Sequence, residues 1–271
     1  MFWIYLIFPI IVISSCKDAT YIEKEMAVPV SSESKPESTE IIKYKVEIVD
    51  TFEHNTNYYT QGLTWFDGCM YEGTGNLNES KLIKYNNNNK VEKIIPIDDN
   101  FFGEGITVFN NQIYQLTWLN GRCLVYDLKT LKLIKEFTYS GEGWGITNND
   151  SLLIISDGTD NLRFISPTDF RLIKNLKVTY NGKTLGNINE LELVGDILYA
   201  NIYFRDIIVM IDIKSGKVIG EIDIKPLRKH LKDNPKQEVS NGIAYIPQKD
   251  EFILTGKNWN KFFLTKFVEI K

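Results

Sequence analysis

The residues best suited to chemistry in this chain stand in short motifs, most of which contain glycine. Glu104 lies between two glycines in GEGIT, Trp144 lies between two glycines in GWGIT, and Gln61 precedes a glycine in TQGL. Asn189 stands at the corresponding place in a fourth segment, NELE. A carboxylate can move a proton, and amides beside an aromatic face suit a small polar ligand held by few hydrogen bonds. The motifs therefore predict one polar site with Glu104 as its carboxylate. On residue types alone, Glu104 could equally be a structural residue that accepts backbone N–H bonds in its turn.

These motifs belong to a segment that recurs five times and predicts the fold. Aligning Leu63, Ile106, Ile146, Leu191 and Ile243 gives successive intervals of 43, 40, 45 and 52 residues, within reach of the ~40–50 residues of a propeller blade. Further segments rich in β-branched and aromatic residues follow each motif, as expected of strands. The sequence predicts an all-β fold, a five-bladed β-propeller. The recurring segments are TQGLTW, GEGITV, GWGITN, NELELV and NGIAYI.

The fifth repeat ends after its third strand, at Lys271. A candidate for the missing outer strand is YKVEIVDTF, which begins at Tyr44. We expect this N-terminal strand to close the ring by pairing in the last blade, which removes open sheet edges. Only one short helix is predicted, around Leu227 and His230, and it should end before Pro235.

Strand order predicts which side chains share one mouth of the propeller. The loop that leads into each innermost strand and the turn that leaves each second strand lie at the same end, where function usually gathers. The turns leaving the second strands supply five residues: Glu72, Trp118, Asp157, Tyr203 and Lys257. We expect Trp118, Tyr203 and Lys257 to join the pocket. Asp157 is expected mainly to cap its own turn.

The first 40 residues predict export and anchoring. The apolar run MFWIYLIFPIIVIS is too short to span a bilayer, and Ser14-Ser15-Cys16 resembles the lipobox of bacterial lipoproteins. We therefore expect residues 1–16 to be a lipoprotein-type signal peptide with an acylated Cys16, although an ordinary signal peptide is the alternative. Residues 17–40 are polar and are expected to form a disordered tether. We expect residues 41–271 to form the propeller domain, exported and lipid-anchored to a bacterial cell envelope.

Composition excludes several other classes. The net charge is −4, from 31 Lys plus Arg against 35 Asp plus Glu, so the basic excess expected of a nucleic-acid binder is missing. Three cysteines and two histidines, spread far apart, do not match a zinc site. Cys69 and Cys123 fall at opposite ends of the predicted blades and should not form a disulfide. We predict no metal and no cofactor, and leave open a structural calcium ion in the central channel.

Ten motifs in order resemble one known family, the plant and bacterial type of glutaminyl-peptide cyclotransferase, also called glutamine cyclotransferase or glutaminyl cyclase. The likeness covers residues 44–271, and the motifs are specific as a set. They are YTQGL (59–63), YEGTG (71–75), FGEGIT (102–107), QLTW (115–118), GWGIT (143–147), SDGT (156–159), NELE (189–192), ANIY (200–203), NGIAY (241–245) and TGKNW (255–259).

The resemblance implies a metal-independent propeller enzyme that converts the N-terminal glutamine of peptides or proteins to pyroglutamate and releases ammonia. It implies a catalytic role for Glu104. Substrate-binding positions fall on Gln61, Trp118, Trp144, Asn189 and Lys257. Tyr203 stands where the family usually has Trp, so an aromatic wall is kept but its indole N–H is lost. We expect a monomer whose partners are glutamine-initiated peptides and, through the anchor, a membrane.

Two alternatives remain at the level of sequence. A non-catalytic, lipid-anchored propeller could serve as a binding or scaffold module, because this fold hosts many functions. A lactonase or sugar-acting propeller would need several carboxylates and amides around a central metal, and only Glu104 is a strong candidate ligand in the motifs that lead into the first strands.

Overall fold

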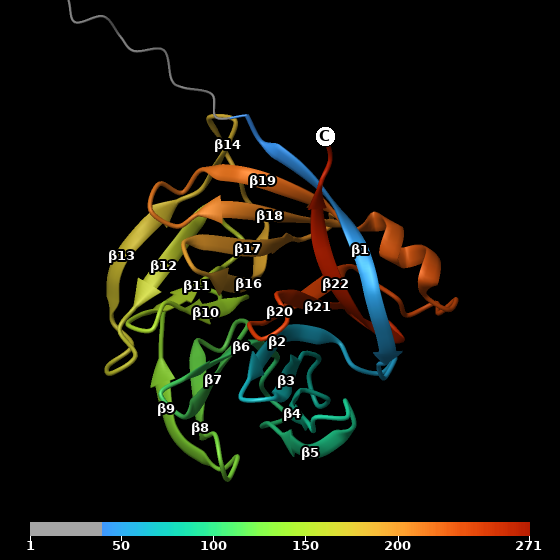
Figure 1. Cartoon of the computed structure of the whole chain (residues 1–271). Coiled ribbons are helices and arrows are strands. Elements are labelled where there is room, and N and C mark those ends of the chain that lie inside the picture. The colour runs from blue at the N-terminus through green and yellow to red at the C-terminus, as the bar shows by residue number, and fades with distance from the viewer. Residues whose placement is uncertain (1–39) are drawn as a thin grey trace, which may run out of the picture. The chain divides into compact units, whose positions relative to one another are not determined.

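The computed structural model describes residues 40–271, which form an all-β domain with one short helix (Figure 1). The predicted signal peptide, Cys16 and nearly all of the tether lie outside the described residues. Within residues 40–271, no helix is long and apolar enough to cross a membrane. The principal strands after the first, in chain order, are β2 (Thr60–Phe66), β3 (Cys69–Thr74), β4 (Lys81–Tyr85), β5 (Val91–Pro96), β6 (Gly103–Phe109), β7 (Gln112–Thr117), β8 (Arg122–Asp127), β9 (Leu133–Thr138), β10 (Ile146–Asn148), β11 (Leu153–Ile155), β12 (Asn161–Ile165), β13 (Leu172–Lys177), β16 (Ile188–Val194), β17 (Ile197–Ile202), β18 (Ile207–Asp212), β19 (Val218–Asp223), β20 (Ser240–Ile246), β21 (Glu251–Gly256) and β22 (Lys261–Glu269).

Pairing between chain neighbours divides these strands into four antiparallel units of four strands and a fifth of three, β20 to β22. Three units are separate sheets, which begin with β2, β6 and β10. A fourth unit begins with β16 and a fifth with β20, and these two share one eight-stranded sheet. The first strands contact one another in the order β2, β6, β10, β16, β20 and back to β2. They therefore surround a common centre, which agrees with the repeat found in the sequence.

The N-terminal strand closes the ring as predicted. β1 (Ile42–Glu53) pairs antiparallel with β22, from Tyr44 opposite Glu269 to Glu53 opposite Lys261, and lies beside it in Figure 1. The sequence did not predict a second pairing, in which the start of β1 runs parallel to β19, with Ile42 opposite Gly220. This second pairing covers the outer edge of the fourth unit, an edge that would otherwise expose unpaired backbone groups.

The one helix of the described range is a 3-10 helix, η1 (Lys225–His230), with Pro226 in its first turn and Leu227 buried. It is shorter than the segment the sequence allowed, because Leu231 is already extended at ψ 149°. A small hairpin of β14 (Thr179–Tyr180) and β15 (Lys183–Thr184) was not predicted. Its turn is Asn181-Gly182, with both φ angles positive, a strong hairpin signal that lies outside the repeated segments.

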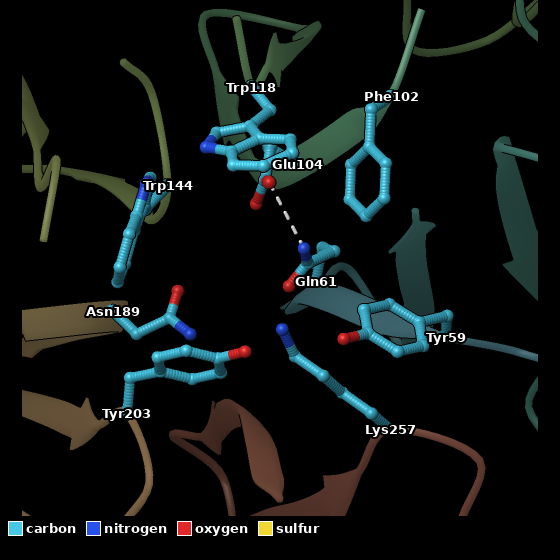
Figure 2. Close-up of a pocket in the computed structure, with 9 residues that line it drawn as sticks. All are labelled: Tyr59, Gln61, Phe102, Glu104, Trp118, Trp144, Asn189, Tyr203 and Lys257. Carbon is cyan, nitrogen blue, oxygen red and sulfur yellow. Dashed lines mark hydrogen bonds between the residues drawn. The ribbon is translucent and has the colours of Figure 1, made fainter. Parts of the chain in front are cut away.

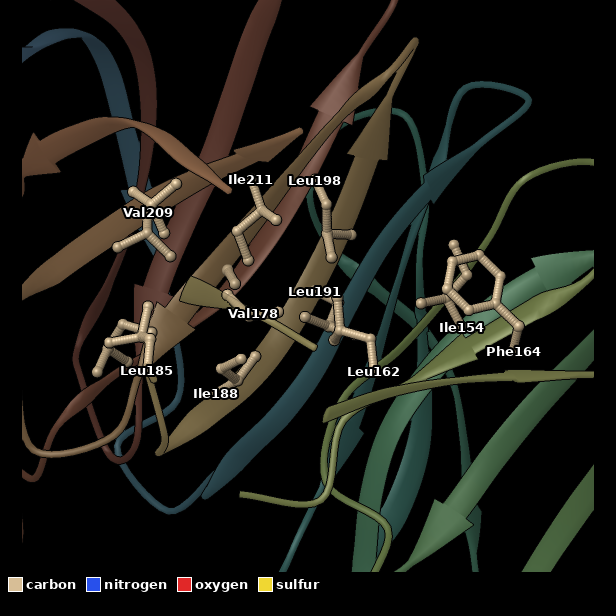
Figure 3. Close-up of a cluster of buried hydrophobic side chains, with 13 residues drawn as sticks. Ile154, Leu162, Phe164, Val178, Leu185, Ile188, Leu191, Leu198, Val209 and Ile211 are labelled. Atoms are coloured by element: carbon tan, nitrogen blue, oxygen red, sulfur yellow. The ribbon is translucent and has the colours of Figure 1, made fainter. Parts of the chain in front are cut away.

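Apolar side chains pack between neighbouring units. Figure 3 shows one such cluster, in which Leu162 and Phe164 of β12 meet Leu191 of β16 and Leu198 of β17. All four side chains are almost completely buried. The packing holds the third and fourth units together by hydrophobic burial, worth about 1.5–3 kcal/mol for each large aliphatic side chain.

A buried polar cluster fastens the seam between the fifth and first units. His54, which directly follows β1, donates from Nδ1 to the Trp259 carbonyl (2.7 Å) and places Nε2 3.0 Å from Glu72 Oε1. Glu72 also accepts hydrogen bonds from the hydroxyls of Thr60 (2.7 Å) and Tyr85 (2.6 Å). The sequence placed Glu72 at the mouth. In the structure Glu72 lies inside the first unit and serves ring closure.

Among the described cysteines, Cys69 and Cys123 are both free, as predicted. Cys123 is fully buried on β8, whereas Cys69 at the start of β3 is partly exposed.

Candidate active site

Three of the predicted site residues sit in the same backbone irregularity. Gly103 pairs with Thr117, and the next pair joins Ile106 to Gln115, so Glu104 and Gly105 share the single partner position of Leu116. The same register shift occurs between β16 and β17 around Asn189, and between β2 and β3 around Gln61. An extra residue of this kind is a β-bulge, which bends a strand and redirects its side chain. The bulges turn these side chains toward the mouth.

Glycines after the site residues allow the units to meet at the centre. A Cβ atom on Gly105 would lie 2.6 Å from the carbonyl oxygen of Trp144, and one on Gly145 would clash with the carbonyl oxygen of Asn189. Because Gly105 has no Cβ atom, its backbone can approach Trp144 closely enough for its N–H to donate to the Trp144 carbonyl at 2.7 Å. The Glu-Gly and Trp-Gly dipeptides therefore reflect close backbone approach between neighbouring first strands.

The residues that leave the second strands are held by a recurring backbone bond. Trp118 N–H donates to Phe102 O (3.0 Å). Tyr203 N–H likewise donates to Asn187 O (2.8 Å). Lys257 N–H donates to Val239 O (3.0 Å). Phe102 lies two residues before Glu104, and Asn187 lies two residues before Asn189. The bond therefore holds Trp118 beside the Glu104 bulge and Tyr203 beside the Asn189 bulge.

One pocket gathers every pocket residue that the sequence predicted (Figure 2). Its volume is about 190 Å³, the space of about six water molecules at ~30 Å³ each, so it suits a single residue of a ligand. Tyr59 and Phe102 also line the pocket, and the sequence did not predict them as site residues. The predicted residues that line it are Gln61, Glu104, Trp118, Trp144, Asn189, Tyr203 and Lys257.

Asp157 does not line this pocket. It accepts hydrogen bonds from the backbone N–H and the hydroxyl of Thr159, as expected of a turn cap, and lies 3.5 Å from Arg163 Nε.

Glu104 is the carboxylate of the pocket and is almost fully buried. Its Oε1 accepts a hydrogen bond from Gln61 Nε2 at 3.0 Å, drawn as a dashed line in Figure 2. Burial raises the pKa of Glu104 well above its ordinary value; the positive charge of Lys257 opposes this shift, and the negative charge of Glu142 adds to it. A carboxyl group with a raised pKa is a stronger base than an ordinary carboxylate and is better suited to take up a proton.

Lys257 carries the opposing charge of the pocket. Its side chain is buried, and its Nζ lies 4.6 Å from the ring centre of Tyr59 and 4.9 Å from that of Tyr203. Burial lowers the pKa of Lys257 to about 8, while the charges of Glu104 and Glu238 act in the opposite direction. The ammonium is therefore still mostly protonated at neutral pH and is held by two aromatic faces.

Aromatic rings form the walls and contact one another edge to face. Phe102 lies between Tyr59 and Trp118, with ring centres 6.0 and 5.6 Å away, and Trp144 meets Tyr203 at 5.5 Å. A single oxygen of Glu142, Oε2, accepts hydrogen bonds from the indole N–H groups of both Trp118 (2.7 Å) and Trp144 (2.8 Å). Glu142, which the sequence did not predict as a site residue, thus fixes the two tryptophans relative to each other.

Asn189 presents an unused acceptor to the pocket. The residue is buried, and its Oδ1 has no hydrogen-bond partner within the described chain. A buried acceptor without a partner costs about 1–3 kcal/mol, so this oxygen is suited to receive an N–H group from a ligand. Gln61 is fixed differently, because Asn241 Nδ2 donates to its backbone carbonyl at 3.2 Å.

The residues in the described range do not assemble a metal centre: between positions 40 and 271, no three His, Cys, Asp or Glu side chains are grouped so that they could hold an ion. The polar groups that line the pocket are one carboxylate, two amides, two phenols, two indole N–H groups and one ammonium, which repels a cation.

Comparison with known proteins identifies the family of this chain. The family model for glutamine cyclotransferase matches residues 22–267. A glutaminyl-peptide cyclotransferase of Arabidopsis thaliana is 32% identical over 227 residues, which cover 82% of this chain and 71% of the plant protein. The crystal structure of Myxococcus xanthus glutaminyl cyclase superposes with a TM-score of 0.80 at 30% identity, covering 86% of this chain and 100% of the bacterial one. This chain belongs to the glutamine cyclotransferase family.

Proposed function

We propose that this protein is a glutaminyl-peptide cyclotransferase, which cyclises the N-terminal glutamine of peptides or proteins to pyroglutamate and releases ammonia. The observation that supports this best is the pocket, in which Glu104 and Lys257 stand within aromatic walls and next to an unused acceptor on Asn189. Its volume of about 190 Å³ suits one residue. Family membership supports the same activity.

The reaction needs mainly orientation and one proton shuttle. The α-amine nitrogen attacks the γ-amide carbon of the same residue, so a new C–N bond forms and the amine gives up a proton. A free α-amine has a pKa of about 7.7–8.0, so part of it is already unprotonated at neutral pH. Holding nucleophile and carbonyl in line can supply up to ~7–11 kcal/mol.

Glu104 is the proposed shuttle. It takes the proton from the attacking amine and returns it to the nitrogen of the γ-amide, so that the C–N bond breaks and ammonia leaves. The raised pKa of Glu104 suits this task, because a more basic carboxylate accepts the proton of the amine more readily than an ordinary one.

Charge develops on the γ-carbonyl oxygen when the amine attacks. The Lys257 ammonium is the proposed donor to this oxygen; a well-placed donor contributes ~2.7–4 kcal/mol to the transition state. Asn189 Oδ1, which lacks a partner within the described chain, is proposed to accept an N–H from the substrate amine. Gln61 is proposed to hold Glu104 through their 3.0 Å hydrogen bond.

The aromatic residues are proposed to exclude water and to hold the substrate. Trp118 and Trp144 present their rings to the pocket, and ring faces favour a cationic amine. Tyr203 completes the wall with a phenol in place of the usual indole, which changes substrate preference but leaves the shuttle intact.

The scaffold alternative is not favoured, because the carboxylate, the ammonium and the amides all remain in one pocket. We further propose that the reaction needs no metal or cofactor, since the acid, base and cation that it requires are side chains. A chelator should then leave turnover unchanged. Loss of turnover that added Ca²⁺ restores would contradict this.

The test of the activity is direct. The purified protein is incubated with peptides that begin with glutamine, and mass spectrometry follows the loss of ammonia. A matched set that begins with asparagine, which would have to form a smaller four-membered ring, serves as the control. Absence of product from every glutamine peptide would favour the scaffold.

Export and anchoring at Cys16 are also proposed, on the basis of the apolar leader and the small residues before this cysteine. Metabolic labelling with a fatty acid should mark the native protein but not a Cys16→Ser variant. We propose a monomer; sedimentation of the domain at several concentrations should give one mass of about 27 kDa, the share of the 31.3 kDa chain that residues 41–271 contribute.

A further inference from the structure

Three exposed apolar side chains surround the candidate site and have no role in the proposed chemistry. Phe204, Leu119 and Leu77 have exposed fractions of 74%, 64% and 56%, the three highest values among the exposed large hydrophobic residues of the described chain. Single exposed apolar residues are common on protein surfaces, so their shared location matters more than their number. We refer to these three residues as the apolar rim.

All three lie in loops that leave the second strand of a unit toward the pocket. Leu119 directly follows Trp118, and Phe204 directly follows Tyr203, both of which line the pocket. Leu77 lies two residues after Gly75, whose Cα region packs against the Phe102 ring. The first and second units are neighbours around the ring, whereas Phe204 belongs to the fourth.

Phe204 is held in a conformation that costs free energy. Its φ is +66°, which is unusual for a bulky side chain, and such strain of about 1–3 kcal/mol tends to persist where function uses it. The strained backbone places the Phe204 ring 3.9 Å from the Tyr203 ring, centre to centre. Phe204 therefore extends the aromatic wall of the pocket outward into solvent.

The loop of Leu77 is also fixed in place. Asn76 and Asn78 on either side of it have positive φ, Asn78 N–H donates to the Asp99 carbonyl (3.2 Å), and Ser80 Oγ donates to the Asn76 carbonyl (2.7 Å). Beside Leu119, Asn120 Nδ2 donates to the Asn100 carbonyl at 3.1 Å. Rim residues on fixed loops lose little entropy when a ligand binds.

A peptide whose first residue fills the pocket must leave through this mouth. The pocket holds about one residue, so the second and third residues pass over the loops that carry the apolar rim. The corresponding loop of the third unit is acidic, with Asp157 and Asp160. In the fifth unit, Asn258 and Trp259 are buried. Three of the five loops around the mouth therefore each offer the peptide one exposed apolar side chain.

We propose that the apolar rim of Leu77, Leu119 and Phe204 binds apolar side chains at the second and third positions of the substrate, so that the enzyme prefers glutamine peptides with leucine or phenylalanine there. This inference rests on the proposed function and names its substrate class. The rim selects among glutamine peptides, whereas the pocket determines whether glutamine reacts at all.

The experiment compares kcat/KM of the full-length protein for peptides of equal length and charge that differ only at the second position, with leucine, phenylalanine, serine or glycine. The leucine and phenylalanine peptides should exceed the serine peptide by about fivefold to tenfold, which corresponds to roughly 1–1.4 kcal/mol. Phe204→Asn removes the ring but keeps a residue that tolerates positive φ, and this ratio should fall toward one. Leu119→Ser should lower it as well.

Leu172→Ser is the matched control, because Leu172 is also an exposed apolar residue but lies on the outer strand β13; its ratio should equal that of the native protein. Equal kcat/KM for all second residues in the native protein would overturn the inference. The inference would also be overturned if the native protein and Phe204→Asn gave the same ratio of leucine to serine peptide turnover while Phe204→Asn abolished binding to lipid vesicles. The rim would then be a membrane contact. No turnover of any peptide would refute the proposed function itself.

Discussion

Replacing Glu104 with glutamine should abolish most activity and at the same time stabilise the protein. Glu104→Gln keeps the size of the side chain and an oxygen that can accept the Gln61 hydrogen bond, but it removes the proton shuttle. General acid–base groups contribute ~10²–10⁴ in rate, which corresponds to about 2.7–5.4 kcal/mol of transition-state stabilisation. Turnover of a glutamine peptide, followed by ammonia release, should fall by that factor.

The gain in stability follows from the raised pKa of Glu104. Since the folded protein holds this proton more tightly than the unfolded chain, the favourable contribution is present below the unfolded pKa of about 4.3 and is lost as pH rises through the folded pKa. Above its folded pKa, the native protein therefore bears a cost of about 1.4 kcal/mol for every tenfold by which folding tightens the binding of this proton. The neutral variant avoids this cost.

Urea unfolding at several pH values measures the difference. Glu104→Gln should be more stable than the native protein at pH 8, and the two should converge toward pH 4. Glu92→Gln, which alters an exposed carboxylate on β5, should change neither activity nor this pH dependence. If Glu104→Gln kept turnover within tenfold of the native protein, Glu104 would not be the proton shuttle. If its free energy of unfolding at pH 8 were lower than that of the native protein, burial of the Glu104 charge would not be costly.

Other consequences can be measured separately. The pKa of Lys257, about 8, predicts that kcat/KM falls as pH rises above 8, when the ammonium is lost; a profile that stays flat to pH 10 would contradict this role. Glu142→Gln removes a negative charge that raises the pKa of Glu104, so the acid limb of the kcat/KM profile should move to lower pH; an unmoved limb would show that the two carboxylates are uncoupled. Glu72→Ala leaves the buried Thr60 and Tyr85 hydroxyls without their acceptor, so it should cost about 1–3 kcal/mol per group left unpaired in urea unfolding, against less than about 1 kcal/mol for the exposed Glu92→Ala. Equal losses would show that this cluster does not stabilise the seam.

The repeated motifs predicted the pocket residues correctly in most units. The prediction was wrong for Glu72 and Asp157, because both were counted one or more positions away from the residue equivalent to Trp118. Ile106 pairs with Gln115, and Trp118 follows three residues later. In the first unit Leu63 pairs with Glu72, so the residue equivalent to Trp118 is Gly75, not Glu72. In the third unit the same count leads to Gly158, beside the Trp144 ring, instead of Asp157. Neither shift could be seen without the strand register.

Residues two positions before the predicted site residues were missed for a different reason. Tyr59, Phe102 and Glu142 all stand at such a position, in YTQ, FGE and EGW. All three residues lie in the segments that lead into the first strands, so a comparison of this position across the units could have identified them. The short motifs pointed to the glycine-flanked residue alone.

Catalysis and ring closure depend on the same seam. Gln61 comes from the first unit and Lys257 from the fifth, and the strand that closes the ring ends at Glu53, next to His54. His54 binds the carbonyl of Trp259, two residues after Lys257, and Glu72, which in turn holds the Thr60 hydroxyl, one residue before Gln61. Opening the seam would therefore separate the Gln61–Glu104 pair from the ammonium before any blade lost its own hydrogen bonds. A substitution that opens the seam should therefore lower turnover even though it changes none of the side chains that react.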